Sequence, residues 1–198
     1  MTYAVFFAVG LGVIAGRWLL PGSLYIHLDG ITSLALAALV LGVGIDIGRN
    51  RSVWHRLQQL GFRILMVPLL VAIGSVTGAS LAGLVMNMPF NEASAVGAGF
   101  GWYSLSGIIL AQIYNVETGA LAFLANVIRE LIALISIPFL AKRIGKIAAI
   151  APGGATTMDT TLPLIVRFAG PEVAVIAFFS GVILTLAVPF LVPLLISF

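Results

Sequence analysis

The sequence predicts an all-α integral membrane protein with about five transmembrane helices and two oppositely oriented re-entrant or broken-helix segments, an inverted-repeat transporter-like fold. Two observations on composition indicate the class: 61% of the 198 residues are hydrophobic and only 9% are charged, whereas soluble domains carry about 25% charged residues. The third observation is that glycine- and hydroxyl-rich stretches interrupt the apolar sequence at residues 97–107 and 151–163. Irregular backbone is tolerated inside a bilayer only where protein or a water-filled cavity satisfies its polar groups, so these stretches predict a buried polar site.

Apolar runs of membrane-spanning length account for most of the chain, because a spanning helix needs about 20 mostly apolar residues. They cover approximately residues 3–20, 31–48, 62–86, 119–141 and 171–198. The two irregular segments lie between the later runs, at about 93–114 and 147–170. We therefore treat residues 1–198 as a single membrane transport domain. No cleavable signal peptide is expected, since the first run lacks a charged segment before it and carries Arg17 near its far end.

Positive charge predicts the orientation of the chain. The net charge is +3, and the basic residues cluster in short loops at 49–63 and 142–146, which is a topology signal and not a sign of nucleic-acid binding. Both loops can be cytoplasmic only if the segment at 93–114 enters the membrane and returns to the same face. The charge pattern thus favours re-entrant segments whose tips meet near the midplane, with the N-terminus cytoplasmic and the C-terminus outside. The alternative is that both motifs are broken but complete crossings.

Glu130 is the sharpest candidate for a substrate- or ion-binding residue. It lies in the middle of an apolar run, where a charge costs roughly 2.5–3.5 kcal/mol and so normally faces protein or a cavity. Asn126 lies one turn earlier on the same helical face, while Arg129 points about 100° away. The alternative is a structural charge pair in which Arg129 or Glu130 reaches a neighbouring helix.

Two aspartates are further candidates. Asp159 lies among four threonines, and a carboxylate beside hydroxyls and freed carbonyls suits a hard cation or an ammonium group. The alternative role for Asp159 is a helix cap. Asp46 lies near the inner end of the run at 31–48, either as part of the site or as an interfacial charge paired with Arg49 or Arg51.

The other candidate binding residues supply flexible backbone or hydroxyl groups: Gly99, Gly101, Tyr103, Ser104, Ser106, Gly153, Gly154, Thr156 and Thr157. A helix that restarts after Gly99 or Gly101 would point free N–H groups at an anion such as an amino-acid carboxylate. Trp102 and Tyr103 are alternatively ordinary interfacial aromatics. No metal or cofactor is expected, because the two histidines are isolated and cysteine is absent.

Three sequence strings together resemble the lysine exporter family LysO. They are GFGWYSLSGI at Gly99–Ile108, RELIA at Arg129–Ala133, and GATTMD at Gly154–Asp159 followed by TLP. The resemblance covers most of residues 31–198 and is to the family's carboxy-terminal portion. It implies export of L-lysine and toxic lysine analogues across the inner membrane, with Glu130 at the family's acidic position. Full-length members of the family carry an additional amino-terminal membrane portion. The resemblance therefore also implies a homodimer, or a small membrane subunit that supplies this portion.

We therefore expect a secondary transporter that exports a cationic amino acid, L-lysine by the resemblance, with possible proton or cation coupling. Burial of a carboxylate near a cavity favours its neutral form, which would permit proton coupling. The alternatives are a channel-like pore and a non-transporting membrane subunit of a two-component exporter. An enzyme is not expected, because the sequence shows no nucleophile–base constellation.

Overall fold

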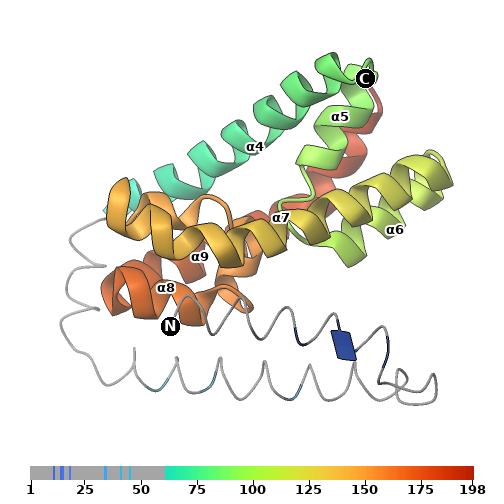
Figure 1. The fold of residues 1–198 in the computed structure, drawn as a ribbon. Coiled ribbons are helices and arrows are strands. Elements are labelled where there is room, and N and C mark those ends of the chain that lie inside the picture. The colour runs from blue at the N-terminus through green and yellow to red at the C-terminus, as the bar shows by residue number, and fades with distance from the viewer. Residues whose placement is uncertain are drawn as a thin grey trace.

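The computed structural model describes residues 61–198 and, before them, the isolated residues Leu11, Ile14, Ala15, Trp18, Leu34, Leu41 and Ile45. The expected helices at 3–20 and 31–48, the site candidate Asp46 and the location of the N-terminus therefore lie outside the described residues. Figure 1 shows the described part as an assembly of long helices around two short helical hairpins.

Three helices of the described part are long and apolar enough to cross a membrane: α4 (Met66–Val85), α7 (Val116–Arg143) and α9 (Pro171–Ile196). They confirm the apolar runs predicted at 62–86, 119–141 and 171–198 as helices. A short 3-10 helix, η3 (Gly61–Leu65), precedes α4. The ends of α7 carry the expected signals, since Asn115 accepts a hydrogen bond from the Thr118 N–H at 2.7 Å and Arg143 lies in the last turn.

The long helices alternate in direction. Val67 near the start of α4 packs against the core cluster that contains Ile176 from the start of α9, so these two helices begin at the same end of the molecule. We call this the basic end, because the loop after α7 also reaches it with Lys142, Arg143 and Lys146. The opposite end, called here the far end, holds the start of α7 and the end of α9 (Figure 1).

The first hairpin is formed by α5 (Phe90–Gly97) and α6 (Tyr103–Ile113), joined by a break at residues 98–102. Phe100 and Gly101 make the turn with positive φ angles of 49° and 99°. The Tyr114 hydroxyl donates to Glu92 Oε1 at 2.9 Å, so the chain leaves the hairpin beside the place where it entered. The hairpin thus starts and finishes at the far end, and the predicted irregular segment at 93–114 is helical except at the break.

The second hairpin, residues 144–169, contains the 3-10 helices η4 (Ala148–Ile150) and η5 (Gly154–Met158) and the helix α8 (Leu162–Ala169). Its inward arm and its return arm pack into one core cluster, where Ile150 and Ile165 contact residues of α7 and α9. Gly170, with φ at 98°, then turns the chain into α9. This hairpin therefore starts and finishes at the basic end.

The tips of the two hairpins touch. We define the first tip as residues 98–102 and the second tip as residues 151–161. The Ala155 N–H of the second tip donates to the Phe100 carbonyl of the first tip at 2.8 Å. Segments that lie more than fifty residues apart in the chain therefore share a backbone hydrogen bond, and the candidate site lies beside this contact.

Candidate functional site

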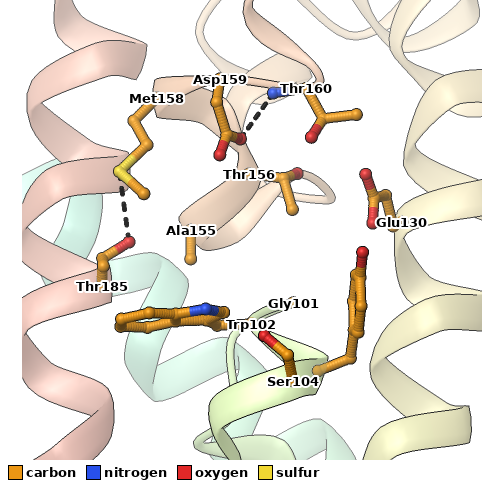
Figure 2. A pocket seen from close by; sticks show the side chains of 11 residues that line it. Gly101, Trp102, Ser104, Glu130, Ala155, Thr156, Met158, Asp159, Thr160 and Thr185 are labelled. Atoms are coloured by element: carbon orange, nitrogen blue, oxygen red, sulfur yellow. Dashed lines mark hydrogen bonds between the residues drawn. The ribbon is translucent and has the colours of Figure 1, made fainter. Parts of the chain in front are cut away.

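A cavity of about 330 Å³ lies where the two tips meet α7 and α9 (Figure 2). This size falls within the range of about 300–1,000 Å³ that is typical of small-molecule sites. Each hairpin supplies one wall, and α7 and α9 supply one residue each. The cavity is lined by Gly101, Trp102, Tyr103 and Ser104 of the first hairpin, Ala155, Thr156, Met158, Asp159 and Thr160 of the second, Glu130 of α7 and Thr185 of α9.

Two carboxyl groups dominate the chemistry of this cavity. Glu130 and Asp159 come from different elements, are both half-buried, and point toward the same space in Figure 2. Asp159 Oδ1 accepts a hydrogen bond from the Thr160 N–H at 2.5 Å. None of the described residues that line the cavity is a lysine, arginine or histidine. The arrangement suits a cationic or proton-binding occupant.

The first hairpin presents the start of a helix to the cavity. Helix α6 begins at Tyr103, and its N-cap residue Trp102 makes no side-chain capping hydrogen bond. The first N–H groups of a helix lack intrahelical acceptors and carry partial positive charge, so this end of α6 favours an anionic group. The indole of Trp102 lies below Ala155 and Thr156 in Figure 2 and closes that side of the cavity.

Asn126 does not line the cavity but holds the first tip in place. Its side chain is buried, with 3% exposed, and its Oδ1 accepts a hydrogen bond from the Gly101 N–H at 2.7 Å. Its Nδ2 donates to the carbonyls of Ala122 at 2.9 Å and Val96 at 3.3 Å. The amide therefore supplies an acceptor for the Gly101 N–H inside the break and ties the end of α5 to α7 through the Val96 carbonyl.

Gly99 and Ser106 belong to the same support. A Cβ atom at Gly99 would lie 2.5 Å from Asn126 Nδ2 and 2.8 Å from Ser106 Oγ, so only glycine fits there. The Ser106 hydroxyl donates to the Trp102 carbonyl at 2.9 Å. Of the first-hairpin candidates, Gly101, Tyr103 and Ser104 thus reach the cavity, while Gly99 and Ser106 lie behind its wall.

The second tip is held by its own threonines. The buried Thr157 hydroxyl lies 2.7 Å from the Gly154 carbonyl and 2.7 Å from the Ala177 carbonyl of α9. The Thr161 hydroxyl donates to the Thr156 carbonyl at 3.0 Å, and the Thr156 hydroxyl donates to the Gly153 carbonyl at 2.9 Å. Thr156 and Asp159 reach the cavity, whereas Gly153, Gly154 and Thr157 shape the loop from behind.

Arg129 points away from the carboxylates, as the helical spacing predicts. Its Nε donates to the Pro152 carbonyl at 3.0 Å, its Nη1 to Ser75 Oγ of α4 at 2.6 Å, and its Nη2 to the Ala151 carbonyl at 3.3 Å. Arg129 therefore reaches a neighbouring helix, as the alternative expected, but these acceptors are uncharged oxygens and do not form the charge pair of that alternative. Glu130 instead faces the cavity.

Several lining residues were not among the candidates chosen from the sequence: Trp102, Ala155, Met158, Thr160 and Thr185. Thr160 and Met158 flank Asp159 and could have been chosen with it. Thr185, whose hydroxyl lies 3.4 Å from Met158 Sδ, gave only a weak signal as a lone polar residue in an apolar stretch of α9.

The model of the lysine exporter LysO family matches residues 6–196. The chain belongs to this family. The resemblance found in the sequence is thereby confirmed, and it extends beyond residues 31–198 toward the N-terminus. With its long apolar helices, this member of the LysO family is a membrane protein. No solved structure matches the chain.

Two curated relatives differ in length. The lysine exporter LysO of Escherichia coli is 36% identical over 166 residues, which cover 84% of this chain and 55% of that protein. The putative lysine exporter of Haemophilus influenzae is 32% identical over 191 residues, which cover 96% of each chain. The present chain thus spans about half of the length of the Escherichia coli relative and nearly all of the Haemophilus influenzae relative.

Proposed function

We propose that this chain is a secondary transporter that exports L-lysine, or a closely related cationic amino acid, out of the cell through the cavity between its two tips. Membership in a family described as lysine exporters supports the substrate class. The observation that carries the proposal is that Glu130 and Asp159, from α7 and the second hairpin, line one cavity with no basic lining side chain in the described part of the chain.

The charges of the cavity complement those of lysine. Lysine carries two ammonium groups and one carboxylate, and the cavity offers two carboxylates and the start of helix α6. In this proposal Glu130 and Asp159 each hold an ammonium group, and the hydroxyls of Thr156 and Thr160 accept further hydrogen bonds. The N–H groups at the start of α6 hold the substrate carboxylate. The indole of Trp102 packs against the aliphatic chain or against an ammonium group.

The two hairpins would be re-entrant and would enter the membrane from opposite faces. Their openings lie at opposite ends of the molecule, and Lys142, Arg143 and Arg167 lie at the basic end, which supports a cytoplasmic location for that end. The C-terminus would then lie outside the inner membrane and the N-terminus inside. Proton or cation coupling would act at Glu130 and Asp159. In this scheme each carboxylate binds either an ammonium group of the substrate or the coupling ion, so the two would alternate during the cycle.

The functional assembly would contain a second copy of this chain or a small membrane subunit. The support is the greater length of the Escherichia coli relative, of which this chain spans 55%. Light scattering on the purified protein in detergent measures the mass of the assembly directly. A monomer that transports lysine at the full rate would contradict this part of the proposal.

Lysine counterflow into proteoliposomes tests the function. We expect Glu130→Gln and Asp159→Asn each to lower the rate at least about tenfold, because each removes a charge-assisted hydrogen bond to an ammonium group. Glu117→Gln is the matched control, since Glu117 lies exposed in the first turn of the same helix and should leave the rate unchanged. Lysine counterflow that is unaffected by Glu130→Gln contradicts the assignment. A non-saturating current without counterflow would favour a channel-like pore.

A further inference from the structure

Arg129 is connected to both hairpins at once. It donates directly to the carbonyls of Pro152 and Ala151 in the second tip, at 3.0 and 3.3 Å. It also donates at 2.6 Å to the hydroxyl of Ser75, which in turn donates at 2.8 Å to the carbonyl of Gly97 at the end of α5. A single side chain on α7 therefore fastens the second tip and, through one serine of α4, the arm that leads into the first tip.

This connection lies behind the contact between the tips. The carbonyl oxygen of Phe100 accepts the backbone hydrogen bond from Ala155, and a Cβ atom at the neighbouring Gly154 would collide with that oxygen and lie 2.8 Å from Arg129 Nη2. The guanidinium, the second tip and the first tip are thus packed together without space for a side chain between them. Any separation of the tips must also move them relative to Arg129.

The second tip has a cavity on each side. Ala155 and Thr156 line the cavity of about 330 Å³ described above, called here the acidic cavity. On the other side, Ala151 and Pro152 line a second cavity of about 440 Å³ together with Arg129 and residues of α4. The two cavities share no lining residue in the described part of the chain, and the intervening Gly153 and Gly154 are buried. The contact between the tips therefore lies between the two cavities.

The hydrogen bonds of Arg129 are of a kind that stabilises a closed arrangement. A guanidinium carries a fixed charge and rigidly oriented donors, so its hydrogen bonds are shorter and stronger than those between neutral groups. All the acceptors described above are uncharged oxygens, and separating the tips would leave some of these half-buried groups without partners. The arrangement therefore costs more to open than the single backbone bond between the tips would require.

We propose that Arg129 is a positioning residue for transport, which together with Ser75 holds the barrier between the two cavities closed. This inference rests on the proposed transport function, and it assigns Arg129 no contact with the substrate. In the transport cycle the tips part when the bonds from Arg129 to Pro152 and from Ser75 to Gly97 are released. Weakening either bond makes the acidic cavity accessible from the side of the second cavity.

Cysteine accessibility tests this role, because the chain contains no cysteine of its own. Thr185→Cys places one thiol in the acidic cavity, and a membrane-impermeant maleimide is added to one face of the membrane at a time. With Arg129 and Ser75 intact, we expect labelling from one face to be much faster than from the other. Arg129→Lys and Ser75→Ala should each raise labelling from the slow face about tenfold, as expected for the loss of one charge-assisted hydrogen bond.

Two control variants make the test specific. Ser75→Thr keeps the hydroxyl, so labelling from the slow face should remain as slow as in the protein with Ser75. Ser80→Ala removes a serine of the same helix whose hydroxyl, among the described residues, donates to the Val76 carbonyl of its own helix at 2.8 Å, and should leave labelling unchanged. If Arg129→Lys does not accumulate in the membrane, Ser75→Ala decides the question. Unchanged slow-face labelling in Ser75→Ala, or an equal increase in Ser80→Ala, would overturn the proposal.

Lysine export separates this inference from the function on which it rests. We expect Ser75→Ala to lower the maximal rate about tenfold, because tips that are no longer held closed complete fewer productive cycles. The KM for lysine should stay the same, because the residues that line the acidic cavity are untouched. A raised KM with an unchanged maximal rate would place Ser75 and Arg129 in substrate binding and overturn the positioning role. Faster slow-face labelling in a protein that exports no lysine would retain the role of Arg129 and reject the proposed substrate.

Discussion

The two tips of this protein reach the same point by different means. The first tip is held from outside, because the amide of Asn126 on α7 accepts from Gly101 and donates to Val96. The second tip also receives hydrogen bonds from Arg129 of α7, but it adds bonds of its own, which join the hydroxyls of Thr156, Thr157 and Thr161 to carbonyls within the tip. A break between two helices can therefore be stabilised either by one amide on a neighbouring helix or by a threonine-rich sequence that supplies its own partners.

This difference also divides the chemistry of the cavity. The first tip leads directly into α6 and contributes the start of a helix, while the second tip contributes Asp159 and the hydroxyls of Thr156 and Thr160 (Figure 2). The hydroxyls that shape the second tip are thus neighbours of those that line the cavity. Substitutions that disturb one tip and leave the other intact sharpen this comparison.

The largest effect is expected from Gly154→Ala, which disturbs both tips. Gly154 has a φ angle of 59°, and an added Cβ would collide with the Phe100 carbonyl. We expect a loss of about 3 kcal/mol in the free energy of unfolding, with lysine export abolished. Gly74→Ala in α4 is the control, because no described atom lies within 4 Å of its Cβ position and alanine favours a helix. Equal thermal stability of the two variants in detergent would contradict the tip contact.

Asn126→Ala should have the next largest effect and act on the first tip alone. It leaves the Gly101 N–H without its Asn126 acceptor in the protein interior and removes one of the two hydrogen bonds to the Val96 carbonyl, at a cost of about 2 kcal/mol. Asn91→Ala, which removes a 3.3 Å bond to the Ile196 carbonyl, is the matched control. A larger loss of thermal stability for Asn91→Ala would refute the role of Asn126.

Single threonine substitutions in the second tip should have smaller effects, because several hydroxyls form hydrogen bonds that stabilise this tip. Thr157→Val keeps the shape of the side chain and removes the hydroxyl beside the Gly154 and Ala177 carbonyls, which should cost about 1 kcal/mol. Thr77→Val is the control, since the exposed Thr77 hydroxyl donates to carbonyls of its own helix α4 in the part of the chain that the structure describes. Denaturation in detergent measures both. A cost for Thr157→Val as large as that for Asn126→Ala would mean that the two tips are held alike.

The smallest effect concerns the opening of the first hairpin. The hydrogen bond to Glu92 raises the pKa of the Tyr114 hydroxyl above its ordinary value near 10. Because the folded-state pKa is raised, the stabilising bond is fully present below the ordinary pKa and is lost as the pH rises through the raised value. Glu92→Gln should therefore lower the midpoint of phenolate absorbance, with Tyr114→Phe identifying the signal. A midpoint that does not move would exclude the bond in solution.

Much of the fold follows from the sequence. The lengths of the apolar runs predict α4, α7 and α9, and the glycine-rich stretches predict where the hairpins turn. The charge pattern predicts hairpins that return to the side from which they enter, and the bond between Tyr114 and Glu92 agrees with this for the first one. Glu130 and Asp159 were recognisable because charge is costly at membrane depth, and both line the cavity.

Other features of the site are not readable from the sequence, because they depend on tertiary contacts. Asn126 shares a helical face with Glu130, yet its amide is used by the backbone of the first tip. Thr185 joins the cavity from a helix that spacing alone gives no reason to place there. The acceptors of Arg129 lie on α4 and the second tip, more than fifty and more than twenty residues away.

Equilibrium binding of L-lysine to the purified protein tests the central claim most directly, with norleucine as a ligand of the same shape that lacks the side-chain ammonium group. The account predicts that lysine binds, that norleucine binds at least about tenfold more weakly, and that Glu130→Gln combined with Asp159→Asn removes this preference. Equal affinity for lysine and norleucine in the parent protein, or undiminished preference for lysine in the double variant, would contradict it.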